Sequence, residues 1–73
     1  MTRDEWIASF AERIDAEPPS AADVDGILRL AAIAAHGSER TAAPVACWIA
    51  AGTGRPLEEL HEIADGVQPE PGS

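Results

Sequence analysis

A histidine, a serine, an arginine and a threonine gather in the segment "HGSERT", between two alanine-rich apolar stretches. Imidazole, guanidinium and hydroxyl groups can bind phosphate or carboxylate, and a helix N-terminus would add backbone N–H donors. The segment has no glycine-rich phosphate loop, and the chain has no lysine. Any chemistry here would therefore be binding. The candidate ligand or partner-binding residues are His36, Ser38, Arg40 and Thr41.

The same segment has the features of a corner between two helices. Gly37 directly after His36 predicts a helix C-terminus, with the glycine left-handed and the histidine facing the negative end of the helix dipole. Thr41, or Ser38 as a second choice, would cap the next helix, whose first turn tolerates Pro44. A helix-helix corner is the main interpretation, and an anion site or a protein contact is the alternative.

The other reactive side chains show no spacing that predicts catalysis or metal binding. The two histidines and the single cysteine fit neither C-x-x-C nor H-E-x-x-H, and the chain has no G-x-S-x-G turn. His61 and Glu62 are expected on an exposed helix face. Cys47, flanked by Ala46 and Trp48, is typical of a small buried hydrophobe in a reducing compartment. We therefore predict no catalytic residue, metal ligand or cofactor, and no enzymatic activity.

Composition narrows the possible partners. The chain has 73 residues and a formal net charge of −8, with all five basic residues being arginines spread from Arg3 to Arg55. Nucleic acid and anionic membranes attract clustered basic residues, so neither is an expected partner. No segment approaches the roughly 20 apolar residues of a membrane span, and "MTRDEW" begins no signal sequence. The expected location is the cytoplasm.

Apolar residues recur at helical spacing in the first segment, "TRDEWIASFAERIDAE". Trp6, Ile7, Phe10 and Ile14 form one stripe, and acidic residues occupy much of the remaining surface. Thr2 and Glu5 fit a capping box at the N-terminus. The helix is expected to end at the Pro18-Pro19 pair, because proline disfavours helical geometry at the residue before it.

Three further helices are predicted, over "SAADVDGILRLAAIAAHG", "AAPVACWIAAG" and "PLEELHEIADG". Ser20 with Asp23, or Asp23 alone, would cap the first of them. That helix is apolar over more than half its circumference, which predicts a central position with neighbours on two sides. Gly26 inside it indicates either the first turn or tight packing. The last helix is short and must dock on the others to form.

The sequence thus predicts an all-α fold: a small bundle of three longer helices and one short C-terminal helix. The domain would span residues 1–66, and the Pro-rich residues 67–73 would form a mobile tail. Trp6 and Trp48 are expected in the core as its largest apolar side chains. An exposed tryptophan would instead be the best interface candidate, because tryptophan is enriched at binding hot spots.

The order "DVDGILRLAAIAAHGSERTAAPVACWIAAG", together with the earlier "EWIASF", resembles an actinobacterial family of small helical domains. Those domains occur alone or fused to nucleotidyltransferases of the molybdenum-cofactor guanylyltransferase type. The resemblance implies no particular reaction, and it suggests an accessory role near molybdenum-cofactor metabolism. It implies that the characteristic corner consists of Ala35, His36, Gly37, Arg40, Ala43 and Pro44.

These observations favour a non-catalytic accessory or protein-interaction module, with Trp48 added to the candidate binding residues. Two alternatives are kept. One is a homodimer, because a short core gains stability from burial against a second copy. The other is binding of a small anion or nucleotide-like ligand between His36 and Thr41. The expected partner is another protein or a second copy of the chain.

Overall fold

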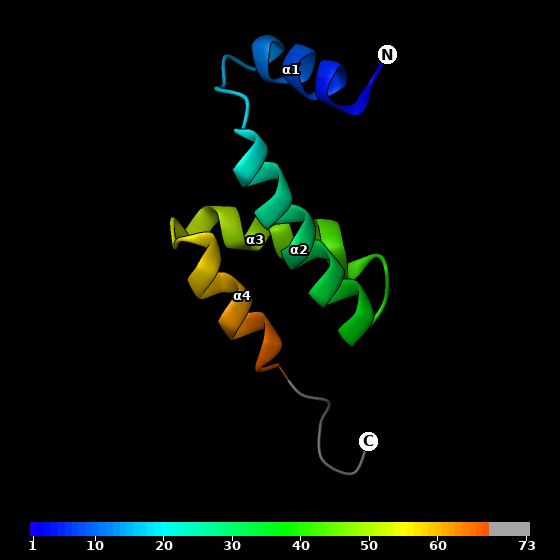
Figure 1. Cartoon of the computed structure of the whole chain (residues 1–73), viewed down its shortest axis with the longest axis vertical. Coiled ribbons are helices and arrows are strands. Elements are labelled where there is room, and N and C mark those ends of the chain that lie inside the picture. The colour runs from blue at the N-terminus through cyan, green and yellow to red at the C-terminus, as the bar shows by residue number, and fades with distance from the viewer. Residues whose placement is uncertain (68–73) are drawn as a thin grey trace.

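Four helices make up the part of the chain that the computed structural model describes, residues 1–67, and that part contains no strand (Figure 1). The all-α prediction, with three longer helices and a short C-terminal one, is confirmed. The predicted tail lies outside the described residues except for Val67. The helices are α1 (Arg3–Arg13), α2 (Ala21–Gly37), α3 (Ala42–Thr53) and α4 (Leu57–Asp65).

Both ends of α1 are closed by local hydrogen bonds. The Thr2 hydroxyl accepts from the Glu5 amide at 3.1 Å, and the Glu5 carboxylate accepts from the Thr2 amide at 2.8 Å. This confirms the predicted capping box. Hydrogen bonding of the Glu5 carboxylate to the Thr2 backbone amide, and to a lesser degree to the Thr2 side chain, lowers the pKa of Glu5. The carboxylate is therefore the form that caps the helix.

The C-terminus of α1 precedes the position predicted from the proline pair. Asp15 has a left-handed backbone with φ 57°. The Asp15 amide donates to the Glu12 carbonyl at 3.2 Å, and the Ala16 amide donates to the Ala11 carbonyl at 2.8 Å. This pattern is a Schellman motif with aspartate in the place usually taken by glycine. The prolines thus lie in the connection to α2.

The corner between α2 and α3 forms, but its predicted caps are wrong. Gly37 is the last residue of α2 and is not left-handed; the left-handed glycine is Gly54 after α3, with φ 70°. The Ser38 hydroxyl closes α2 by donating to the Ala34 carbonyl at 2.8 Å. Thr41 has a helical backbone, and its side chain makes no capping hydrogen bond. A hydroxyl thus replaces the glycine at this C-terminus.

α2 is the central helix and packs extensively against both α3 and α4, as predicted (Figure 1). Its N-terminus has the expected capping box, formed by Ser20 and Asp23. Leu30 of α2 is only 5% exposed and lies at the centre of this three-helix unit. A Cβ atom added to Gly26 would lie 2.7 Å from a terminal methyl of Leu57, so Gly26 marks the tight packing of α2 on α4.

α1 lies beyond the N-terminal end of α2 and does not pack extensively on any other helix (Figure 1). Ala11 is its only buried residue. The prediction that both tryptophans belong to the core is wrong, because Trp6 is 57% exposed and Trp48 is 81% exposed. Trp6 stays exposed because no other helix covers the stripe of Trp6, Phe10 and Ile14 on α1. Trp48 stays exposed because α2 covers only one side of α3 and Trp48 lies on the other side.

Candidate interaction surface

The aromatic face of α1, made of Trp6, Phe10 and Ile14, is the first uncovered apolar surface. These residues follow each other at four-residue steps and therefore share one side of the helix. The rings of Trp6 and Phe10 stack with centroids 5.3 Å apart and planes inclined by 20°. All three side chains remain half exposed or more. The two stacked rings thus form an aromatic surface that is exposed to water.

The outer face of α3, made of Val45, Trp48, Ile49 and Gly52, is the second such surface. Steps of three, one and three residues place them along the side of α3 away from α2. Val45 and Ile49 are each 59% exposed, and Trp48 is the more exposed of the two tryptophans. Around Trp48 and Gly52 the surface is hollowed, and Ala51 and Thr53 complete the rim.

The predicted corner residues are all exposed, and the structure brings them to one turn. His36, Ser38, Arg40 and Thr41 lie between α2 and α3. In the part of the chain that the structure describes, no hydrogen bond or ion pair joins these four side chains to one another. The hydroxyl of Ser38 is engaged with the α2 backbone. The corner is an open turn, and Trp48 lies apart from it on α3.

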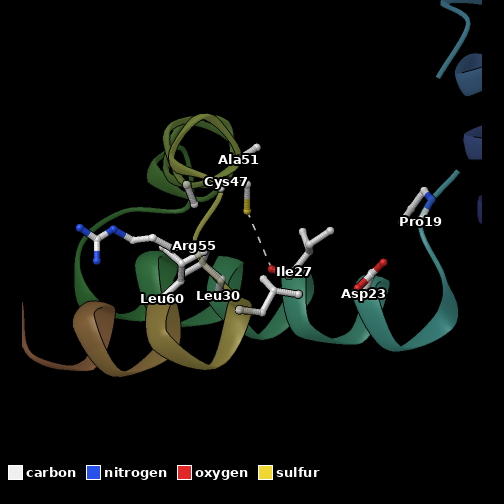
Figure 2. A pocket seen from close by; sticks show the side chains of 11 residues that line it. Pro19, Asp23, Ile27, Leu30, Cys47, Ala51, Arg55 and Leu60 are labelled. Atoms are coloured by element: carbon white, nitrogen blue, oxygen red, sulfur yellow. Dashed lines mark hydrogen bonds between the residues drawn. The ribbon is translucent and has the colours of Figure 1, made fainter. Parts of the chain in front are cut away.

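An apolar hollow between α2, α3 and the start of α4 was missed by the sequence analysis (Figure 2). Its walls include Ile27, Leu30 and Leu60. Cys47 points into it, with Sγ 3.8 Å from the Ile27 carbonyl oxygen. Burial raises the pKa of the Cys47 thiol. A thiol held neutral by its surroundings is a poor nucleophile, so the expectation of a packing role fits its place here.

The charged groups at the rim of this hollow already have partners. The carboxylate of Asp23 caps α2 by accepting from the Ser20 amide. The guanidinium of Arg55 forms an ion pair with Glu59 one helical turn along the chain. No buried side-chain nitrogen or oxygen among residues 1–67 lacks a hydrogen-bond partner. The hollow is therefore a surface for apolar packing.

His61 is not on an exposed face, contrary to the prediction. Its Nε2 atom lies 2.7 Å from the Gly26 carbonyl oxygen, and because a carbonyl can only accept, the ring donates through its Nε2 hydrogen across the α2–α4 contact. A Cβ added at position 26 would meet Leu57 of the same helix contact. Within the described residues, no three His, Cys, Asp or Glu side chains lie close enough together to hold a metal ion.

Comparison with known proteins gives one match. Residues 1–69 match a family described as a domain of unknown function, DUF6457. No curated protein and no solved structure matches the chain. Among the helices that the structure describes, none has both the length and the apolar character that crossing a bilayer requires.

Proposed function

We propose that this chain, which belongs to the DUF6457 family of domains of unknown function, is a non-catalytic accessory module that binds another protein through its uncovered helix faces. The observation that carries the proposal is the 81% exposure of Trp48 in a chain with only two tryptophans. Tryptophan exposed on a rigid helix offers a large contact area at a low cost in side-chain entropy, and it is enriched among binding hot spots.

The contiguity of the exposed apolar residues also supports protein binding. Scattered apolar residues are normal on a protein surface, but contiguous apolar patches mark interaction sites. Here the exposed residues are contiguous on two helices, in the stack on α1 and along the outer face of α3. The polar groups beside the hollow are engaged in caps and an ion pair. These features support protein binding more than catalysis.

The family resemblance adds a narrower proposal about the partner. The segment "EWIASF", which also carries the resemblance, contains Trp6 and Phe10 of the aromatic face of α1. We propose that one partner is a nucleotidyltransferase of the molybdenum-cofactor guanylyltransferase type. Such an enzyme should bind the wild-type chain in a pairwise titration, and Phe10→Ala should weaken the binding. Equal binding by the two chains would refute this choice of partner.

Site-specific photo-crosslinking tests the general proposal. A benzophenone amino acid replaces Trp48 in one variant and Phe10 in another, and the exposed Glu62 of α4 in the control. We expect a discrete crosslinked protein from position 48 or 10, because these side chains would lie inside an interface. The control position should give no such product. Equal labelling from all three positions, or none from any, would refute the proposal.

A further inference from the structure

We propose that the protein covering the outer face of α3 is a second copy of this chain, so that two copies form a symmetric dimer through this helix. The inference rests on the proposed function and names the partner of one of its two surfaces. It leaves the aromatic face of α1 free for a different protein. The charge and the shape of this face favour a second copy over other occupants of α3, and the exposed surface of the chain leaves room for one.

The first observation is the distribution of charge. The chain carries a formal net charge of −8, so most pairs of surfaces from two copies repel each other. α3 has no charged residue from Ala42 to Thr53. It is therefore the one helix that two copies can bring together without placing like charges in contact. A basic partner, by contrast, would find no acidic side chain on this helix.

The second observation is the amount of exposed surface. A compact monomer of 7.6 kDa exposes about 4,300 Å², whereas this chain exposes 5973 Å². Residues 68–73 can account for at most about 900 Å² of the excess even if fully extended. About 800 Å² then remains for the described part, which equals the share that each partner buries in an interface of standard size. This excess is spread over α1 and the outer face of α3, and the outer face of α3 supplies part of it to a second copy.

The third observation is the shape of the face. Trp48 and Gly52 lie one helical turn apart on the same side of α3. Trp48 is 81% exposed and forms one wall of a shallow, open hollow that Gly52 also lines, with open space where a Cβ of Gly52 would lie. In an antiparallel pair of α3 helices, a two-fold axis midway between the two positions puts each indole against Gly52 of the other copy. Such a face is complementary to itself, as an isologous interface requires.

Sedimentation velocity at increasing concentration of the full chain tests this inference. Interfaces of standard size have dissociation constants from micromolar to picomolar, so we expect mostly dimer at about 100 µM. Trp48→Ala should raise the dissociation constant by at least about 30-fold, the equivalent of a hot-spot residue. Leu28→Ala, at a half-exposed apolar residue of α2 outside both proposed faces, is the matched control and should leave the constant unchanged. A wild-type chain that is monomeric at about 100 µM would overturn the inference.

Gly52→Leu separates the interface from folding. In the single chain the added side chain meets nothing within 4 Å of its Cβ, and leucine favours the helix more than glycine does. In the dimer it fills the hollow that receives Trp48. We therefore expect a more stable monomer and a dimer weakened by about tenfold or more. Unchanged dimerisation in this variant would overturn the proposed arrangement.

The two proposals can fail separately. A crosslink from position 48 to a different protein, with a monomeric chain in sedimentation, would refute the dimer and support the interaction module. A crosslinked species of twice the mass of the chain from position 48 supports both. A chain that is monomeric and gives no crosslink from position 48 or 10 refutes both.

Discussion

The contact between α2 and α4 is closely packed, whereas the aromatic face of α1 is open to solvent, although both lie on helices with apolar residues at helical spacing. Between α2 and α4, Gly26 admits Leu57, and His61 reaches the Gly26 carbonyl. On α1, Trp6 and Phe10 have only each other and the solvent. Helical spacing of apolar residues creates both faces, but close approach of a second backbone decides which face becomes core. Gly26 thus lies in a helix contact, whereas both tryptophans lie at the surface.

The largest expected effect comes from truncating the centre of the three-helix unit. Leu30→Ala should lower the free energy of unfolding by about 2–5 kcal/mol, because it leaves a cavity among α2, α3 and α4. Phe10→Ala should cost less than about 1 kcal/mol, since half of its ring is already exposed. Urea denaturation followed by circular dichroism at one fixed protein concentration measures both. Similar losses of unfolding free energy in the two variants would mean that the aromatic face of α1 is packed as closely as the centre of the three-helix unit.

The next effect concerns the close approach of α2 and α4. Gly26→Leu should destabilise the chain by about 1–3 kcal/mol through overpacking against Leu57, despite the better helix propensity of leucine. Gly37→Leu is the control, since an added Cβ there meets nothing within 4 Å. Thermal unfolding of the two variants provides the comparison. A Gly26→Leu variant as stable as wild type would mean that the helices can move apart freely.

A smaller effect is expected at the hydrogen bond between the same two helices. His61→Ala should cost about 0.5–1.5 kcal/mol, the usual net contribution of such a bond. His61→Gln keeps a side-chain N–H donor and should recover part of the loss. Chemical denaturation of the three chains gives the values. If the glutamine and alanine variants are equally unstable, the donor to the Gly26 carbonyl is not what stabilises this contact.

The smallest effect is a response of α1 to acid. Because hydrogen bonds from Thr2 lower the pKa of Glu5 below its usual 4.5, the capping contribution is present above that value and is lost as the pH falls below it. An NMR titration should show the Thr2 amide moving with Glu5 while the amides around Leu30 stay unchanged. In Glu5→Gln the acid response of Thr2 should vanish. A Thr2 amide that still titrates in this variant would contradict the assignment.

The sequence predicted those parts of the fold that depend on neighbours in the chain. The capping boxes at Thr2 and Ser20 are confirmed, because each needs only residues three apart. The central place of α2 was also predicted, from an apolar surface too wide for one neighbour. The spacing of apolar residues along a helix does not indicate whether another helix covers them. The predicted burial of both tryptophans was therefore wrong.

Other predictions were wrong at helix C-termini, where a different residue ends the helix from the one expected. A left-handed Asp15 ends α1 before the prolines, and the Ser38 hydroxyl closes α2 in place of a left-handed Gly37. The hydrogen bond of His61 to Gly26 joins residues 35 positions apart, which no spacing rule would reveal. Trp48, however, was named from the sequence as a candidate binding residue, and an exposed tryptophan, whether Trp6 or Trp48, was expected to be the best interface candidate. The role of Trp48 stays a prediction.

Fluorescence of Trp48 as a function of concentration tests the central claim most directly. In a Trp6→Phe variant Trp48 is the only tryptophan, and acrylamide quenching reports its access to solvent. We predict strong quenching and red-shifted emission in dilute solution, where the single chain leaves the indole open. Protection and a blue shift should appear on concentration, as a second copy covers α3. Protected emission at every concentration would contradict an open face in the single chain, and strong quenching at every concentration would contradict the dimer.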